Sequence, residues 1–131
     1  MGLINDQFLI GVTGIFFDKN NRILLVKHSY RGGNSWSLPG GYIKKGEHPK
    51  EGLEREVDEE TGYVVSADTR LKIRTDRNNA RLDITYAGDF IGGNYKPSKE
   101  ITNAKFFSFD ELPILPQDQL VFISKACKLR L

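Results

Sequence analysis

Apolar residues fall into short runs separated by polar turns, which is the pattern of a chain rich in β-strands. The run Phe8–Phe17 is rich in Ile, Val, Thr and Phe, and Arg22–His28 is a second apolar run. Because Asp18-Lys19-Asn20-Asn21 lies between them, we expect two strands joined as a hairpin. A loop follows over 29–35, and Pro39-Gly40-Gly41 predicts a sharp turn.

The clearest helical signal begins at Pro49 and ends near Thr61-Gly62. Proline suits the first turn of a helix, and glycine suits the position just past its end. Glu51 places a negative charge in the N-terminal half, where the helix dipole is positive. His48 stands at the capping position that Ser or Thr favours, so we expect this helix to start less firmly.

After this helix, apolar runs predict four further strands, at Tyr63–Ser66, Leu71–Arg74, Leu82–Ile91 and Ala104–Phe109. Asn78-Asn79 stands where a hairpin turn is expected, and 92–99 reads as a loop. Gln117–Leu131 has apolar residues at helical spacing and predicts a closing helix. The order of strands, helix, strands and helix favours an α+β fold in which helices pack on a mixed sheet.

Length and composition exclude several classes of protein. The 131 residues suit a single domain over 1–131, and 39% hydrophobic with 27% charged residues argues against disorder and coiled coils. The one cysteine, Cys127, cannot form an internal disulfide, and no apolar stretch reaches the roughly 18 residues of a membrane span. Met1–Ile10 lacks the features of a signal peptide, so we expect a cytoplasmic protein with no membrane partner.

The net charge of +2 is the sum of two unlike parts. Residues 41–63 hold seven acids and four bases, a net charge of −3, whereas the rest of the chain holds 15 bases and 10 acids, a net charge of +5. An acidic segment within a basic surround suits divalent cations and a phosphorylated ligand. A solvated helix face is the alternative interpretation of the same charges.

Three carboxylates share one side of the expected helix. At 100° per residue, Glu56, Glu59 and Glu60 fall within an arc of about 100°. Like charges four residues apart, as in Glu56 and Glu60, destabilise a helix unless something neutralises them. A divalent cation would do so, and oxygen ligands without a Cys/His cluster suit Mg²⁺ or Mn²⁺ better than zinc.

The neighbours of this arc also favour a site over a solvated face. Gly52 lies in the middle of the arc one turn earlier, and a glycine there indicates close approach of a backbone or ligand. Leu53 and Val57 place the buried stripe beside the carboxylates. The remaining acids of the helix point away and are interpreted as solvated: Glu51, Glu54 and Asp58.

These residues form a recognisable motif. Gly41 is followed after five residues by Glu47 and after seven more by Arg55-Glu56-Val57-Asp58-Glu59-Glu60-Thr61-Gly62-Tyr63. The spacing closely resembles the Nudix box of the MutT-like pyrophosphohydrolases, here residues 41–63, without assigning a subfamily. Tyr63 departs from the family's usual aliphatic residue at a position that serves packing. Trp36-Ser37-Leu38-Pro39-Gly40-Gly41 and Asp110-Glu111-Leu112-Pro113 are similar to further family landmarks.

The resemblance implies an α/β/α sandwich with a mixed sheet, in which the loop ending at Gly41 and the helix form a metal site. By position, the carbonyl of Gly41 and the carboxylates of Glu56, Glu59 and Glu60 would bind Mg²⁺ or Mn²⁺. Such metals neutralise a diphosphate and activate water, so the implied activity is a pyrophosphohydrolase in which water attacks phosphorus.

The resemblance also implies catalytic roles. Arg55 and Glu47 would pair and orient the catalytic carboxylates. Family members differ in whether the general base is a glutamate of the box or one in a later loop, so Glu56, Glu59 and Glu100 all stand as candidates. The oligomeric state is not given by the sequence, although family members are often dimers.

The implied substrate is a nucleoside diphosphate linked to another moiety, and side chains that suit phosphates or a base are Lys27, Arg31, Trp36, Lys44 and Arg81. Asn78 and Asn79 stand where ADP-ribose pyrophosphatases typically have a proline. A nucleoside triphosphate, a nucleotide sugar, a dinucleoside polyphosphate and a capped RNA end all stay open. Other nucleic acids are disfavoured because the bases are scattered and no binding motif occurs.

A rival function is a non-catalytic module that keeps this fold and senses a nucleotide. It would bind ligand without turnover. The set of Glu56, Glu59 and Glu60 favours the enzyme, because a pure binder has no need for three crowded acids.

Overall fold

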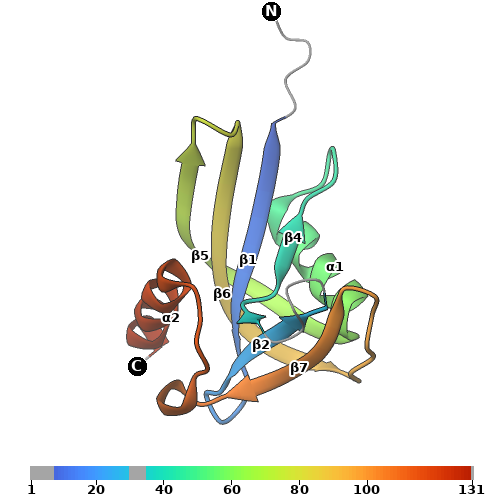
Figure 1. Cartoon of the computed structure of the whole chain (residues 1–131), viewed down its shortest axis with the longest axis vertical. Coiled ribbons are helices and arrows are strands. Elements are labelled where there is room, and N and C mark those ends of the chain that lie inside the picture. The colour runs from blue at the N-terminus through green and yellow to red at the C-terminus, as the bar shows by residue number, and fades with distance from the viewer. Residues whose placement is uncertain (1–7, 30–34, 131) are drawn as a thin grey trace, which may run out of the picture.

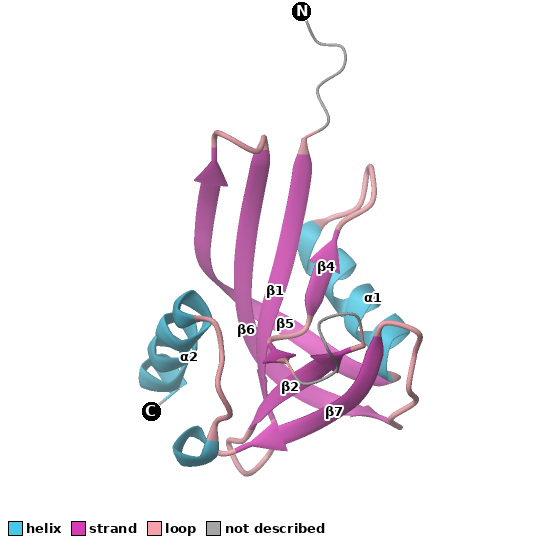
Figure 2. Ribbon diagram, in the orientation of Figure 1, coloured by secondary structure: helices cyan, strands magenta, loops and turns pink. Residues whose placement is uncertain are grey.

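Residues 8–29 and 35–130 are described by the structure, a computed structural model, and they place one mixed sheet between two helices (Figures 1 and 2). The strands are β1 (Leu9–Phe17), β2 (Ile23–His28), β3 (Trp36–Ser37), β4 (Gly40–Tyr42), β5 (Tyr63–Asp76), β6 (Arg81–Gly93) and β7 (Ile101–Phe107). The helices are α1 (Pro49–Thr61), the short 3₁₀ helix η2 (Phe109–Glu111) and α2 (Gln117–Arg130).

Strand β1 lies in the middle of the sheet. It runs parallel to β6 from Leu9, opposite Arg81, to Phe17, opposite Asp89. It also pairs antiparallel with β4 and, through Phe17 and Ile23, with β2, which continues to β3 and β7. The expected hairpin and the mixed sheet are therefore confirmed.

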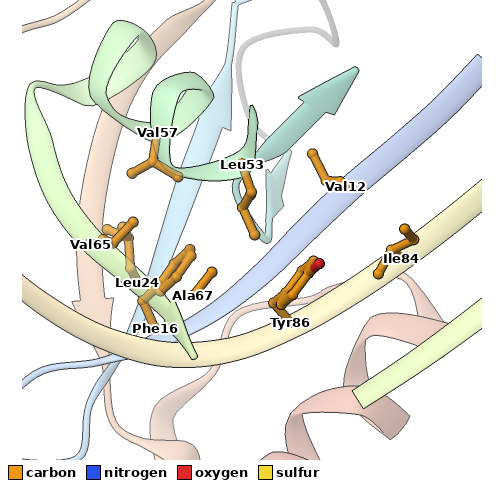
Figure 3. Packing of buried hydrophobic residues seen from close by; sticks show 9 residues of the cluster. All are labelled: Val12, Phe16, Leu24, Leu53, Val57, Val65, Ala67, Ile84 and Tyr86. Carbon is orange, nitrogen blue, oxygen red and sulfur yellow. The ribbon is translucent and has the colours of Figure 1, made fainter. Parts of the chain in front are cut away.

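Alternating residues of β1 supply two separate cores, one on each face of the sheet. Val12 and Phe16 pack on the face covered by α1, where Leu53 and Val57 are fully buried (Figure 3). Both helix residues were expected to lie in the buried stripe. The helix therefore lies on the sheet by its apolar stripe, with the carboxylates at the edge of that contact.

The second core lies under α2. Ile15 and Phe17 of β1 pack there with Ile123 and Ala126 of the helix. Burial on both faces makes β1 an apolar run, and the two covered faces confirm the α/β/α sandwich. Within the described ranges, no helix is long and apolar enough to cross a bilayer.

Helix α1 has the bounds that its end signals predict. Gly62 ends it in a left-handed conformation, with φ of 79°. The expectation of a weak start at His48 was wrong in its reasoning, because the imidazole itself caps the helix. Its Nδ1 accepts a hydrogen bond from the Lys50 backbone N–H at 3.1 Å.

Three expected elements differ in extent. The two short strands predicted at 63–66 and 71–74 are one strand, β5, whose register with β6 shifts between Ser66 and Thr69 and again near Leu71. The last strand begins at Ile101 and ends at Phe107, before η2. Such a shift adds a residue to one strand without ending the pairing. The polar residues between the two predicted strands therefore belong to β5 as well.

The sharp turn expected at Pro39-Gly40-Gly41 was also wrong. Gly40 and Gly41 belong to β4 and lie opposite Thr13 and Val12 of β1. A side chain at Gly40 would collide with the Val12 backbone, so glycine here serves close strand packing instead of a turn.

Candidate functional site

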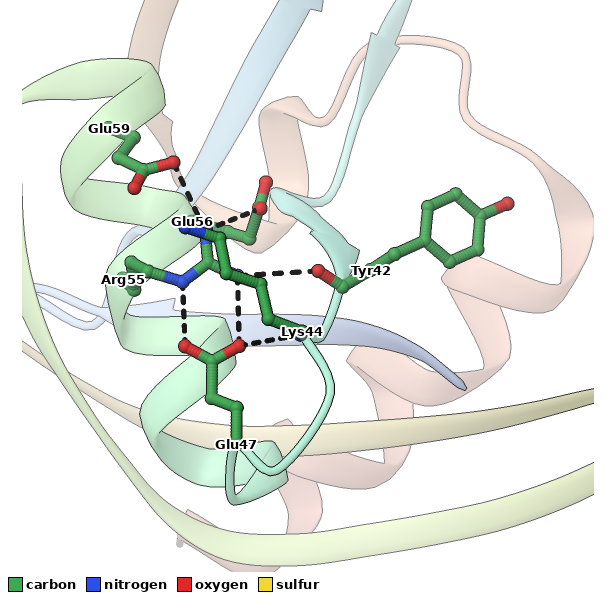
Figure 4. Close-up of polar contacts among 6 residues, drawn as sticks. All are labelled: Tyr42, Lys44, Glu47, Arg55, Glu56 and Glu59. Atoms are coloured by element: carbon green, nitrogen blue, oxygen red, sulfur yellow. Dashed lines mark hydrogen bonds and ion pairs between the residues drawn. The ribbon is translucent and has the colours of Figure 1, made fainter. Parts of the chain in front are cut away.

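Arg55 of α1 lies at the centre of a polar network that joins the helix to the preceding loop (Figure 4). Its guanidinium donates to both oxygens of Glu47, from Nε at 2.6 Å and from Nη2 at 3.0 Å. Nη1 donates to Glu56 at 2.9 Å and to Glu59 at 3.1 Å, and Nη2 reaches the Tyr42 carbonyl at 3.4 Å. One side chain thus fixes the loop and two carboxylates relative to each other.

The Glu47 carboxylate is ionised far into the acid range. Hydrogen bonds from Arg55 and from the Lys44 backbone N–H, the latter at 2.8 Å, lower the pKa of Glu47 to about 2. The same pairing raises the pKa of Arg55. Both groups therefore keep their charges, and the fork-shaped pair holds its geometry, over the whole physiological range.

Two glycines make room for this network. A Cβ on Gly41 would overlap the Glu56 carboxylate, so only glycine allows this carboxylate to lie against β4. A Cβ on Gly52 would lie 2.6 Å from Ile43 Cγ2 and 2.8 Å from Glu47 Oε1. A close approach was expected at Gly52, but the approaching groups are side chains of the preceding loop, not the backbone or ligand that was expected.

Glu60 is the most unusual carboxylate of the helix. It is 7% exposed, and within the described part of the chain its Oε1 is buried without a hydrogen-bond partner. Burial, together with the charges of Glu56, Glu100 and Glu59, raises the pKa of Glu60 to about 8. A buried carboxyl group with an unused oxygen beside further carboxylates is a fitting ligand for a cation.

These carboxylates do not form a closed metal cage in the described ranges, where no three acidic, His or Cys side chains converge. The Arg55 guanidinium lies between Glu56 and Glu59 and binds both of them. The Glu59 side chain is 55% exposed, whereas Glu56 is held against β4. The carboxylate donors and the unused Glu60 oxygen fit a divalent cation. In this structure Glu56 and Glu59 are instead paired with the Arg55 guanidinium.

Of the acids interpreted as solvated, Glu54 is different. Its Oε2 accepts a hydrogen bond from the Ala67 backbone N–H of β5 at 2.8 Å and also binds the Lys50 ammonium. Glu54 therefore ties α1 to the sheet. Glu51 and Asp58 are exposed, as expected.

The candidate substrate contacts are spread over the molecule. Lys44 is exposed in the loop beside Glu47. Lys27 lies over the Trp36 ring, 5.2 Å from its centroid, and that ring packs edge-on against Phe107. Neither Lys27 nor Trp36 is hydrogen-bonded within the Arg55 network. Arg31 lies outside the described residues.

Arg81 lies on the opposite face of the sheet from α1. It is paired with Asp83 at 2.8 Å and donates to the Tyr42 hydroxyl at 2.9 Å. It lines a polar hollow of about 130 Å³ between the sheet and the start of α2, with other walls from Thr13, Lys72, Arg74, Asp83, Thr85, Asp118, Gln119 and Phe122. Arg81 was singled out from the sequence, but the hollow itself was not, because its walls come from four separate elements.

A second hollow, of about 400 Å³, lies at the C-terminal end of α1. It is lined by Asp58, Glu59, Gly62, Asn94, Lys96 and Pro97. Glu59 is thus the only catalytic candidate on its wall among the described residues, and Lys96 was not among the residues singled out from the sequence. The loop 94–100 that forms part of this wall also carries Glu100.

Comparison with known proteins shows one family over nearly all of the chain. The family model described as "NUDIX domain" matches residues 7–126. An ADP-ribose pyrophosphatase of Methanocaldococcus jannaschii is 33% identical over 116 residues, which cover 83% of this chain and 67% of that protein. An NAD-capped RNA hydrolase, NudC, of Pectobacterium atrosepticum is 28% identical over 99 residues, which cover 75% of this chain and 38% of that protein.

Solved structures agree with the sequence comparison. The crystal structure of an ADP-ribose pyrophosphatase from Streptococcus suis is similar with a TM-score of 0.75 and 28% identity, covering 92% of both chains. The chain spans only about two thirds or less of the length of the two curated relatives.

Proposed function

The chain belongs to the NUDIX family of hydrolases, and from this premise we propose that it is a metal-dependent pyrophosphohydrolase. It would cleave the diphosphate of a nucleoside diphosphate that is linked to another moiety. The observation that carries the proposal is Glu60, a buried carboxyl group with an unused oxygen beside Glu56 and Glu59. A helix that only served the fold would gain stability by losing this group.

We assign the metal to the Gly41 carbonyl and the carboxylates of Glu56, Glu59 and Glu60. Hard oxygen donors of this kind suit Mg²⁺ or Mn²⁺. When bound, such an ion supplies charge neutralisation for the diphosphate and a lower pKa for an attacking water. Glu60 would then be ionised at neutral pH, because the cation offsets the burial that raises its pKa in the free protein.

The remaining roles belong to the chain's own side chains. Arg55, held by Glu47, orients Glu56 through the hydrogen bond at 2.9 Å. The proton of the attacking water passes to a carboxylate, for which Glu56, Glu59 and Glu100 are the candidates. Glu100 is exposed on its loop, and its charge reaches Glu60.

The names of the relatives support the substrate class. ADP-ribose and an NAD cap both contain a diphosphate that joins a nucleoside to a second group. We propose a substrate of this chemistry, a class that includes both ADP-ribose and an NAD cap. We also propose a cytoplasmic location, which cell fractionation would test. A homodimer is a further hypothesis, which analytical ultracentrifugation would test.

We place the part of the substrate beyond the diphosphate in the hollow that Arg81 lines. Gln119 holds its carbonyl oxygen toward the Leu38 backbone N–H at 2.9 Å, which leaves its amide NH₂ to donate to a ligand. Thr13 on the same wall pairs with Gly40, the neighbour of Gly41. Because this hollow and Glu56 lie on opposite faces of the sheet, a substrate that reaches both would pass around the edge strand β4.

A substrate panel tests the proposal. Purified protein is incubated with ADP-ribose, NAD-capped RNA, nucleotide sugars, dinucleoside polyphosphates and nucleoside triphosphates, with Mg²⁺ or Mn²⁺ at mildly alkaline pH. Incorporation of ¹⁸O from labelled water into one phosphate product is the expected result. Calorimetric binding of a nucleotide with no cleavage under either metal would instead support the nucleotide-sensing module.

A further inference from the structure

The loop over 94–100, between β6 and β7, lies on the C-terminal end of α1 (Figure 1). The Lys96 backbone N–H donates to the Thr61 carbonyl at 2.8 Å. This bond satisfies one of the carbonyls that a helix leaves free at its end. It also fixes the backbone of Lys96 directly beside the last turn of the helix.

Two glycines allow the backbones to touch. Gly62 has φ of 79°, and a Cβ on it would overlap the Asn94 carbonyl oxygen. Gly93 has φ of 90°, and a Cβ on it would overlap the Gly62 carbonyl oxygen and lie 3.1 Å from the Tyr63 Cα. Any side chain at either position would push the loop away from the helix.

The loop brings a cation to an acidic helix end. The last turn of α1 has no basic residue, and it carries Asp58, Glu59 and Glu60. Lys96 lines the same hollow as Glu59. A diphosphate that approaches these carboxylates is repelled by them, and a lysine on the wall of the hollow offsets part of that repulsion.

We propose that Lys96 contacts a phosphate of the substrate and that Gly62 is the positioning residue that holds it there. The inference rests on the proposed hydrolase function for its role in catalysis. The ligand that Lys96 would bind is the phosphate group of a nucleotide. Compensation of the helix dipole by Lys96 is a purely structural role. The two roles predict different results for Lys96→Ala, because only a phosphate contact makes the affinity for a phosphate-bearing ligand depend on this side chain.

Binding of nucleoside monophosphates tests the contact without depending on turnover. Each of the four, with Mg²⁺, is titrated by calorimetry into wild type, Lys96→Ala and Lys96→Arg, with the matching nucleosides as ligands without phosphate. We expect Lys96→Ala to weaken the monophosphate that binds wild type about tenfold, Lys96→Arg to restore most of the affinity, and nucleoside affinity to stay unchanged. Lys99→Ala, an exposed lysine in the same loop, is the matched control.

Asparagine substitutions test the role of Gly62. Asn tolerates a left-handed backbone, so Gly62→Asn keeps the end of the helix but still places a Cβ against Asn94. We expect the same tenfold loss, and no further loss when it is combined with Lys96→Ala. Gly46→Asn is the control, because Gly46 has φ of 82° with no atom within 4 Å of a Cβ.

The outcomes separate this inference from the proposed function. Unchanged monophosphate affinity in Lys96→Ala, equal weakening of nucleosides, or no binding of any monophosphate to wild type would overturn the phosphate contact. Normal affinity in Gly62→Asn would overturn the positioning role. Absence of cleavage with the phosphate effect intact would instead overturn the proposed hydrolase and leave a nucleotide-binding protein.

Discussion

The carboxylate of Glu56 lies directly against Gly41, in the space that a side chain on β4 would occupy. This contact joins the helix to the edge strand of the sheet and places a helix carboxylate beside the strand backbone at Gly41. The proposed metal ligands Gly41 and Glu56 are separated by a loop and about two turns of α1, and their proximity depends on the absence of a Cβ.

Gly41→Ala should therefore damage activity more than stability. The added methyl group displaces the end of a flexible Glu56 side chain, which the fold tolerates but a metal site does not. We expect kcat to fall at least about tenfold while Tm changes by only a few degrees. Gly92→Ala, with no atom within 4 Å of its Cβ, is the control, and equal activity in the two variants would contradict the role of the contact.

The pair of Glu47 and Arg55 should contribute to stability in a pH-dependent way. The pKa of Glu47 is lowered from 4.5 to about 2 in the folded protein, so the folded state binds fewer protons than the unfolded chain between these values. Its contribution is present above about pH 4.5 and is lost as pH falls through 2. Urea unfolding of wild type and Glu47→Gln should show a difference at pH 6 that shrinks toward pH 2; a constant difference would count against the pairing.

Glu60 should have the opposite pH dependence in the metal-free protein. Its pKa is raised from 4.5 to about 8, so the folded state binds more protons than the unfolded chain between these values. The free energy of unfolding should thus fall by several kcal/mol as pH rises from about 5 to 8 in EDTA. Glu60→Gln should lack this fall.

Added Mg²⁺ or Mn²⁺ should restore the stability of wild type at pH 8 and have a smaller effect on Glu60→Gln. Thermal unfolding across pH, with and without metal, measures both effects. If metal stabilises the two proteins equally, Glu60 is not a ligand.

Glu54 should be a structural acid on the same helix. Glu54→Gln weakens its bonds to Lys50 and the Ala67 N–H, so we expect a loss of about 1 kcal/mol in the free energy of unfolding and no change in kcat. Chemical unfolding and initial rates measure the two quantities separately. A large loss of turnover in this variant would place Glu54 in the active site.

Local signals predicted the bounds of α1 well. Pro49 and Gly62 mark the helix ends by their own backbone preferences, and the 3.6-residue period alone puts Glu56, Glu59 and Glu60 on one side. Gly52 was likewise informative, because a glycine inside a helix indicates that another group packs closely against it, whether that group is a backbone, a ligand or a side chain. These features depend on residues close together in the sequence.

Features that depend on distant residues were missed or misjudged. Glu54 was interpreted as solvated because its partner, the Ala67 backbone N–H, lies on β5, and the periodicity of the helix does not show where that strand packs. The strand β5 continues through polar residues because β6 pairs with it along its length. Lys96 had no signal because its place depends on the contact between Gly62 and Asn94.

The most direct test of the central claim compares Glu56→Gln with wild type for metal-dependent cleavage of the best substrate in the panel. We predict that wild type cleaves the diphosphate only with Mg²⁺ or Mn²⁺ and that Glu56→Gln loses at least about 100-fold in kcat. Glu51→Gln, an exposed acid of the same helix, should keep wild-type activity. Equal kcat in wild type and Glu56→Gln, or undiminished cleavage in EDTA, would contradict the account.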